Sequence, residues 1–243
     1  NNLMSVNNNN FESLWVDKYR PKTSTDCIGN NTAVTHLKIW LKNWRAINID
    51  FNFDSKSSGK VNLNSRCALI SGTPGIGKTS AAKSICDELG FKYFITNASD
   101  TRSAKALKNS PFFKSVEGYQ MIGAKSDIIS NHVLIFDEVD GMSSGDRGGA
   151  AQLLNFVRAT SIPIICICND SKSQKMRSLE QACAQIKFYK PNKSQLLAKL
   201  KDICKKEKIN IDDNAINLVI EQNNSDIRAC ITNLEIISRS MRY

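Results

Sequence analysis

Short apolar runs rich in β-branched and aromatic residues recur along most of the chain. Each run has the length and composition of a buried strand. Between the first two runs, Lys78–Glu88 has the pattern of a helix, and Gly90 supplies its stop signal. Strands that alternate with helices predict a parallel sheet with helices on both faces. The predicted strands are Cys67–Ser71, Lys92–Thr96, His132–Phe136, Ile162–Cys168 and Gln185–Tyr189.

Further helices are predicted on either side of this α/β region. Thr32–Trp44 carries an apolar stripe at helical spacing, and its aromatic residues are best read as core. After Pro191 the pattern changes to helix following helix, each preceded by a residue that can cap it. These are Gln195–Lys206 after Ser194, Asp213–Gln222 after Asp212, and Asp226–Arg239 after Ser225. The sequence therefore predicts a small three-helix lid domain.

The polar segments and the change of pattern at Pro191 predict the domain organisation. Residues 1–13 are expected to form a disordered tail, 14–190 the α/β domain, and 191–243 the lid. The Asn-, Lys- and Ser-rich stretch 48–65 is expected to be a surface insertion within the α/β domain.

Composition narrows the class of protein. With 243 residues, 41% hydrophobic and 23% charged, the chain has an ordinary soluble composition, and its apolar runs are too short to cross a membrane. None of the eight cysteines is spaced as CxxC, and His36 and His132 fit no ligand pattern, so no cysteine or histidine metal site is predicted. Cys67, Cys166 and Cys168 lie in strand-like runs, which is typical of buried free thiols in a reducing compartment.

The net charge of the chain bears on the kind of partner that it binds. A formal net charge of +10 and a pI of about 9.2 favour a polyanionic partner such as nucleic acid. A lysine-rich solvated surface explains the same charge, so charge alone leaves both readings open.

A phosphate-binding motif follows the first predicted strand directly and opens the next helix. It matches the pattern GxxxxGK[ST] with Gly72, Thr73, Pro74, Gly75, Ile76, Gly77, Lys78 and Thr79. The glycines allow backbone amides to point at phosphate oxygens, Lys78 supplies positive charge, and Thr79 offers a hydroxyl to Mg²⁺. The motif predicts binding of ATP with magnesium.

Polar residues at later strand ends complete a candidate ATPase site. Asp137 and Glu138 follow an apolar strand, where Asp137 can hold magnesium and Glu138 can orient or deprotonate the attacking water. Asn169 ends the fourth strand and can contact the water or the γ-phosphate. Arg228 begins the last lid helix, from which its guanidinium can reach the phosphates. The competing interpretations are that Asn169 is an ordinary strand-end asparagine and that Arg228 is an ordinary surface arginine.

At this point the chain resembles the AAA+ ATPases, and within them the large subunits of replication factor C clamp loaders. The resemblance extends from Leu14 to about Arg242. It is carried by the strings Leu14–Pro21 (LWVDKYRP), Asn97–Ser103 (NASDTRS), Asp137–Met142 (DEVDGM) with Asp146–Gly149 (DRGG), and Ile162–Asp170 (IPIICICND).

The resemblance implies a fold and further site residues. It implies a parallel sheet in the order 5-1-4-3-2, with Val16 and Ile28 beside the adenine base. Arg20 and Ser80 are added to the expected ATP-binding residues. Asn169 and Arg228 match the two residues that the family uses to sense the nucleotide, called sensor 1 and sensor 2.

A catalytic arginine is missing where small clamp-loader subunits carry Ser-Arg-Cys. Here the matching residues are Gln181, Ala182 and Cys183. The resemblance therefore implies a large subunit, whose own ATP hydrolysis needs an arginine finger from a neighbouring chain.

Two partner surfaces are also implied by the resemblance. The clamp-binding motif matches 115–120, with Val116 and Tyr119 as contacts, although Gln120 replaces its second aromatic residue. Phe112 and Phe113 are possible substitutes for the missing aromatic residue. The competing interpretation is that all of these aromatic residues belong to the hydrophobic core. DNA backbone contacts are expected at Arg102 and Arg147, each beside a predicted helix start.

The resulting hypothesis is a nuclear clamp-loader subunit of a hetero-pentamer. ATP binding would assemble a ring that opens the sliding clamp, PCNA, on primer-template DNA, and hydrolysis would release both. A checkpoint or cohesion clamp loader, a non-catalytic ATP- and DNA-binding scaffold, and an initiator or helicase-loading ATPase are the alternatives. The sequence ends after the lid and shows no collar domain, so the chain is expected to be a fragment.

Overall fold

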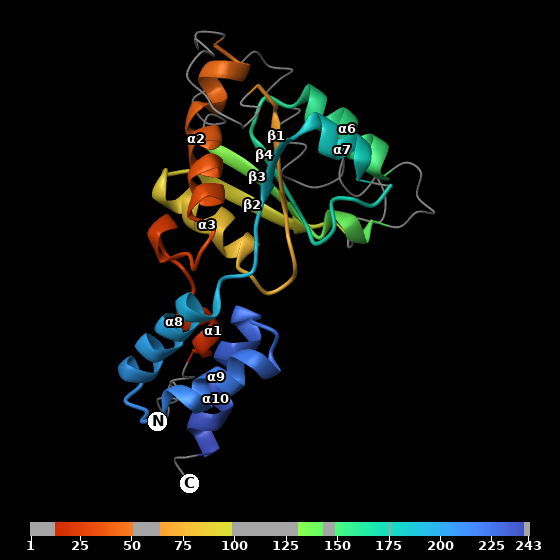
Figure 1. Cartoon of the computed structure of the whole chain (residues 1–243). Coiled ribbons are helices and arrows are strands. Elements are labelled where there is room, and N and C mark those ends of the chain that lie inside the picture. Colours follow the sequence, from red (N-terminus) through yellow and green to blue (C-terminus); the bar gives the residue numbers. More distant parts are fainter. Residues whose placement is uncertain (1–12, 51–63, 99–130, 143–148, 175, 241–243) are drawn as a thin grey trace, which may run out of the picture.

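The computed structural model describes residues 13–50, 64–98, 131–142, 149–174 and 176–240. A sheet with helices on both faces forms one unit, and a smaller helical unit lies against one end of it (Figure 1). The predicted DNA contacts Arg102 and Arg147 and the predicted clamp contacts Val116 and Tyr119 lie outside the described residues. So do Phe112 and Phe113, the tail 1–12, and residues 51–63 of the predicted insertion.

The sheet has five strands, all parallel, in the order β2-β3-β4-β1-β5. This is the predicted 5-1-4-3-2 order read from the opposite edge, so the fold prediction is confirmed. The strands are β1 (Cys67–Ser71), β2 (Lys92–Asn97), β3 (His132–Asp137), β4 (Ile164–Cys168) and β5 (Ala184–Lys187).

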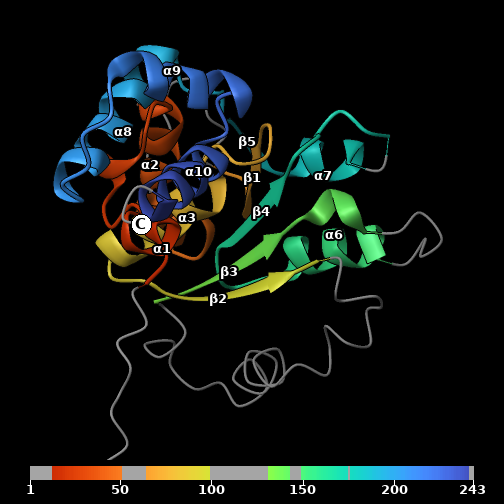
Figure 2. The same cartoon turned by 90° about the horizontal axis from the view of Figure 1, so that it is seen from below.

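The helices of this unit cover both faces of the sheet (Figure 2). Alternating residues of β1 point to opposite faces: Ala68 and Ile70 pack under one pair of helices, and Cys67 and Leu69 under the other. The first pair is α2 (Asn31–Asn48) and α3 (Lys78–Glu88), and the second is α6 (Gly149–Ala159) and α7 (Arg177–Ala182). Trp40 on α2 is completely buried, so the aromatic stripe is core, as expected.

Two predicted strand ends were wrong by a few residues. β4 begins at Ile164 and not at Ile162, because the intervening Pro163 has no amide to donate to the ladder. β5 ends at Lys187, two residues before the predicted end. Beyond it, the side chain of Asn30 satisfies both backbone groups of Tyr189, with the Asn30 Nδ2 to Tyr189 O distance at 2.8 Å and the Tyr189 N to Asn30 Oδ1 distance at 2.7 Å.

The second unit contains the three predicted lid helices, but two of the predicted caps were wrong. The helices are α8 (Lys193–Lys206), α9 (Asp213–Gln222) and α10 (Ile227–Ser240). Asn192 caps α8 in place of Ser194. The Asn192 side chain accepts a hydrogen bond from the Gln195 backbone amide, and the Gln195 side chain accepts one from the Asn192 backbone amide.

Asp226, and not Ser225, caps α10 by accepting from the Ala229 amide at 2.9 Å. The predicted cap of α9 by Asp212 is confirmed, since its side chain accepts from Ala215.

A short helix from the other end of the chain joins this unit. The four residues of α1 (Trp15–Lys18) pack on the lid, and Trp15 is buried among lid residues such as Leu200 and Ile231. The lid core therefore combines the first described helix with the last three (Figure 1).

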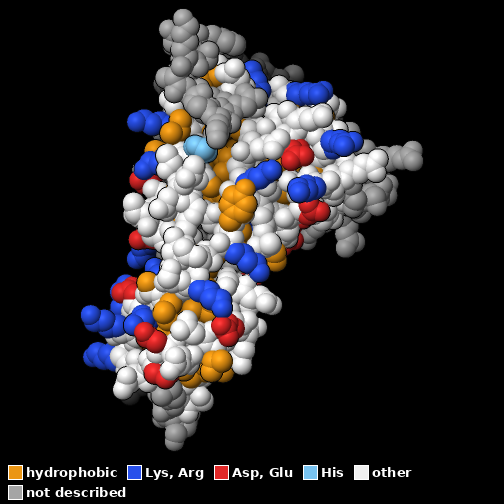
Figure 3. Space-filling model, in the orientation of Figure 1, with side chains coloured by type: hydrophobic (Ala, Val, Ile, Leu, Met, Phe, Trp, Pro, Cys, Tyr) orange, Lys and Arg blue, Asp and Glu red, His pale blue; other side chains and the backbone are white. Residues whose placement is uncertain are grey.

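The cysteines are all free thiols, and Cys67, Cys166 and Cys168 are buried as predicted. Within the described ranges, groups of three or more His, Cys, Asp or Glu side chains arranged to hold a metal ion are absent. Among the same residues, no helix is both long and apolar enough to span a bilayer. On the face shown in Figure 3, Lys and Arg side chains are spread over both units and interspersed with acidic ones.

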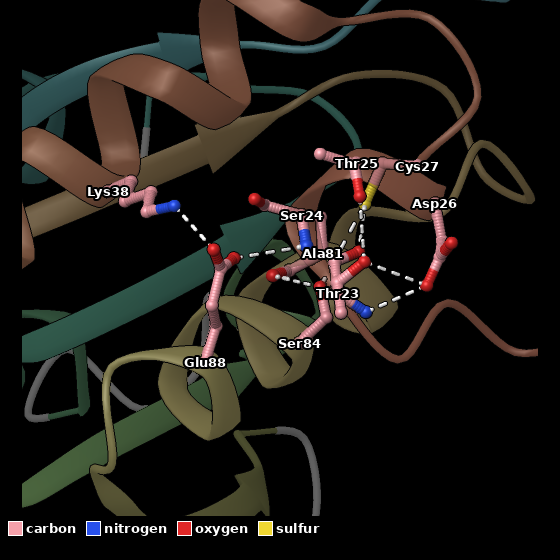
Figure 4. A network of polar contacts seen from close by, with 9 residues as sticks. All are labelled: Thr23, Ser24, Thr25, Asp26, Cys27, Lys38, Ala81, Ser84 and Glu88. Atoms are coloured by element: carbon pink, nitrogen blue, oxygen red, sulfur yellow. Dashed lines mark hydrogen bonds and ion pairs between the residues drawn. The ribbon is translucent and has the colours of Figure 1, made fainter.

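A polar network fixes the segment that leads from α1 into the α/β unit (Figure 4). The 3-10 helix η1 (Ser24–Asp26) is closed by a reciprocal cap between Thr23 and Asp26. Glu88, which ends α3, accepts from the Ser24 amide at 3.2 Å and from the ammonium of Lys38 on α2. These bonds fasten η1 to the two helices that cover this face of the sheet.

Glu88→Gln is expected to reduce the pH dependence of stability. The bonds from Lys38 and Ser24 lower the pKa of Glu88 to about 2, so its contribution is complete above about pH 4.5 and is lost as the pH falls towards 2. Because the pair is partly exposed, we expect a loss of about 0.2–1 kcal/mol at pH 7. Urea unfolding at several pH values measures it. A difference from the unchanged protein that persists undiminished at pH 3 would contradict this role.

Candidate nucleotide-binding site

The phosphate-binding motif forms the turn between β1 and α3. Its three glycines, Gly72, Gly75 and Gly77, have φ values of +154°, +73° and +88°. A Cβ on Gly72 would lie 2.4 Å from the carbonyl oxygen of Phe188, so only glycine fits there. α3 begins at Lys78 with Gly77 before it, so backbone amides of its first turn face the loop, as an anion site requires.

The Lys78 ammonium lies at the centre of the site and is well satisfied. Its Nζ donates to the carbonyl oxygens of Gly72 at 2.6 Å and Thr73 at 2.8 Å, and to Oδ1 of Asn169 at 2.9 Å. Burial lowers the pKa of Lys78, while the nearby carboxylates of Asp137 and Asp140 oppose this shift. The predicted residues Lys78, which begins α3, and Asn169, which follows β4, are thus in direct contact.

The two predicted magnesium ligands also lie together. Thr79 Oγ1 donates to Asp137 Oδ2 at 2.7 Å, and Asp137 Oδ1 accepts from the Glu138 amide at 2.9 Å. A hydroxyl and a carboxylate are the hard oxygen donors that Mg²⁺ prefers. The donor set therefore fits a magnesium ion, which Thr79 and Asp137 would hold.

Glu138 follows β3 in a strained backbone conformation, with φ +54° and ψ +41°. Its exposed side chain accepts from Asn97 Nδ2 at 2.7 Å. Asn97 begins the string 97–103 that carries the resemblance, but sequence reasoning gave it no role, although it ends β2, the strand beside β3. The sheet order would have indicated this contact, because carboxyl ends of neighbouring parallel strands meet at one edge.

Asp140 lies in the quoted string 137–142 and is a second residue to which sequence reasoning gave no role. Its Oδ2 accepts from the backbone amides of Asn169 at 2.9 Å and Asp170 at 3.2 Å. Asp140 therefore joins the segment after β3 to the end of β4 and positions Asn169 beside Lys78. Its signal was present in the sequence as a third carboxylate close behind Asp137 and Glu138.

A cavity of about 140 Å³ lies beside the loop, between the two units. The predicted base-binding residues Val16 and Ile28 both line it, and both pack against the lid core. The other predicted nucleotide residues on its wall are Arg20, Gly75, Ile76, Gly77, Ser80 and Arg228. Arg20 also pairs with Asp17 at 2.8 Å, and Arg228 is exposed. Thr73 and Pro74 form the exposed tip of the loop.

The lid contacts the loop directly. The Ile227 amide at the start of α10 donates to the Gly75 carbonyl oxygen at 3.0 Å. The carboxylate of Asp226 lies against the Gly75 Cα, where an added Cβ would be 1.7 Å from Oδ2. Gly75 is consequently a contact point for the lid as well as part of the phosphate loop.

Residues 68–192 match the sequence model of the "ATPase family associated with various cellular activities (AAA)", just over half of the chain. The chain belongs to the AAA family of ATPases. Residues 193–242 match the "RFC1-like, AAA+ ATPase lid domain", which covers the three lid helices. Membership of this family implies that the chain binds nucleotide.

Curated relatives named "Replication factor C subunit 1" align with nearly all of the chain. The Arabidopsis thaliana protein is 41% identical over 93% of the chain, the human protein 40% over 92%, and the Saccharomyces cerevisiae protein 38% over 95%. The chain spans only about a quarter of these relatives, 25%, 21% and 27% of their lengths.

Among solved structures, the RuvB Holliday junction branch migration motor of Thermotoga maritima shares the fold. Its TM-score is 0.58 at 16% identity, covering 88% of this chain and 63% of RuvB. At this identity the likeness concerns the fold alone.

Proposed function

We propose that the chain is the ATP-hydrolysing module of a clamp-loader large subunit, which helps to open the sliding clamp and place it on primer-template DNA. The observation that carries the proposal is the junction of Lys78, Asn169, Thr79 and Asp137 at the strand ends, followed by a lid of the RFC1-like type. The relatives' name, replication factor C subunit 1, favours the replicative loader over a checkpoint or cohesion loader.

In this proposal each residue has one task. Lys78 and the loop amides bind phosphate oxygens, and Lys78 exchanges a carbonyl partner for a phosphate. Thr79 and Asp137 hold Mg²⁺, which would neutralise charge on the phosphates. Glu138 accepts a proton from the attacking water, and Asn169 and Arg228 contact the terminal phosphate.

An arginine finger from a neighbouring subunit completes hydrolysis. Ala182, the last residue of α7, stands where small subunits carry that arginine, so this chain receives a finger and donates none. The partners would be the small subunits of a hetero-pentamer, PCNA and DNA in the nucleus. Clamp contacts at Val116 and Tyr119 and DNA contacts at Arg102 and Arg147 remain part of this proposal.

Reconstitution tests the proposal. The full-length protein, with the small subunits and the clamp, should load clamps onto primed circular DNA in the presence of ATP. Lys78→Ala in this subunit should reduce loading strongly, whereas Lys205→Ala, an exposed lysine at the end of α8, should not. A full-length protein that binds neither small subunits nor clamp would refute the assignment. The isolated 243-residue chain is expected to be monomeric, and a stable homo-hexamer in sedimentation would also contradict it.

A further inference from the structure

The helix α1 is joined to the lid at both of its ends, although it precedes the α/β unit in the chain. Trp15 is 7% exposed and packs among residues of α8 and α10. The packing of Trp15 holds α1 through apolar contacts. Two lid glutamates add hydrogen bonds to residues of α1, and these bonds fix the rotation of α1 about its own axis as well as its position.

The first glutamate, Glu235 on α10, holds the start of α1. Only 6% exposed, it accepts from the Trp15 backbone amide at 3.0 Å and from Arg239 Nη2 at 2.6 Å. A buried carboxylate with two donors is satisfied, and its loss would leave the Trp15 amide without this acceptor.

The second glutamate, Glu207, follows α8 and holds the end of α1. Its Oε1 accepts from Lys18 Nζ at 2.6 Å and from the Tyr19 hydroxyl at 2.5 Å. Burial and the neighbouring Glu207 raise the pKa of Tyr19, so its hydroxyl keeps the proton that it donates at any physiological pH. The Tyr19 ring is thereby fixed on the wall of the cavity beside the phosphate loop.

The phosphate loop lines the same cavity from the α/β unit. Ile28 follows η1, which Glu88 fastens to α3 through the Ser24 amide (Figure 4), but the Ile28 side chain packs against the lid core, as do those of Val16 and Tyr19. The lid core therefore holds the apolar part of the cavity wall, whereas the phosphate loop belongs to the sheet unit.

We propose that Glu207 and Glu235 are positioning residues for base recognition: they fasten α1 to the lid and so hold Val16 and Tyr19 in place beside the base of the nucleotide. This inference rests on the proposed ATP site. The glutamates touch no nucleotide themselves and act through α1. Because Lys78 and the amides that bind phosphate belong to the turn between β1 and α3, loss of the glutamates weakens the grip on the base and spares the grip on the phosphates.

The test compares ligands with and without a base. Dissociation constants of the 243-residue chain are measured for ATP and, by competition, for inorganic tripolyphosphate, both with Mg²⁺. Glu207→Ala and Tyr19→Phe each remove a hydrogen bond and should weaken ATP binding by about tenfold. Tripolyphosphate binding should stay within about twofold, and Glu207→Gln, which can still accept from Tyr19, should restore most ATP affinity.

Glu221→Ala is the matched control, because it breaks an exposed ion pair with Lys193, between α8 and α9, in which α1 takes no part. Glu235→Ala should behave as Glu207→Ala does if thermal unfolding shows it folded. If Glu235→Ala prevents folding because Glu235 is buried, Tyr19→Phe still tests the inference, since it keeps the aromatic ring. Equal weakening of ATP and tripolyphosphate, or unchanged ATP binding, would overturn the inference. A folded, unchanged protein that fails to bind ATP would instead refute the proposed function.

Discussion

Glu138→Gln is expected to lower the rate of ATP hydrolysis by about 100- to 10,000-fold, while ATP affinity stays close to that of the unchanged protein. The amide keeps the size of the side chain and can still accept from Asn97, whose Nδ2 lies 2.7 Å from Glu138 Oε2. It cannot accept a proton from water. Loss of turnover with retained binding is the result expected for a general base.

The measurement uses the assembled complex with the clamp and primed DNA. The small subunits carry substitutions of their own phosphate-loop lysines, so that hydrolysis at other sites does not mask the effect. Glu221→Gln is the control, because it makes the same chemical change at an exposed carboxylate of the lid. Unchanged turnover in the Glu138 variant would remove its catalytic role and favour the alternative of a non-catalytic scaffold.

The three central strands, β1, β3 and β4, were predictable because their apolar runs are almost completely buried and therefore continuous in the sequence, whereas the edge strands β2 and β5 are partly exposed and were wrongly expected to be buried. β1 and β4 are buried along their whole length, so each appears in the sequence as a continuous apolar run and not as an alternation of apolar and polar residues. The strand ends were less certain, since they depend on single residues. Pro163 delays the start of β4, and the side chain of Asn30, distant in the sequence, pairs with Tyr189 after β5.

Helix caps show a similar limit. Ser194 and Ser225 are good capping residues by type, but Asn192 and Asp226 have the side-chain geometry that reaches the free amides. Competition between neighbouring candidates is decided by backbone angles that the sequence does not specify. Ser225, for example, has a positive φ of +57°, which is incompatible with the extended backbone usual at a cap.

Within the site, local motifs were predictable and long-range contacts were not. The phosphate loop, Asp137 and Glu138 are short patterns with a fixed chemistry. Asp140 and Asn97 act through contacts between strand ends, so finding them required the sheet order. The packing of α1 on the lid joins Trp15 to Glu235, 220 residues apart, and no local pattern indicates it.

Gly75→Ala is expected to destabilise the protein by about 2–5 kcal/mol, well beyond the usual effect of adding a methyl group. Part of the loss is the left-handed backbone, φ +73°, which costs a non-glycine residue about 1–2 kcal/mol. The remainder comes from the lid, because the new Cβ would lie 1.7 Å from Asp226 Oδ2. Asp226 cannot swing away freely, since it caps α10 through the Ala229 amide.

Gly90→Ala separates these two contributions. Gly90 has nearly the same φ, +74°, but an added Cβ there meets nothing within 4 Å. Urea unfolding should therefore show only the backbone loss of about 1–2 kcal/mol for Gly90→Ala. The excess in Gly75→Ala should shrink when Asp226→Gly is added, although that change alone weakens α10 by removing its cap. Equal losses at Gly75 and Gly90 would mean that the lid does not rest on the phosphate loop through Asp226.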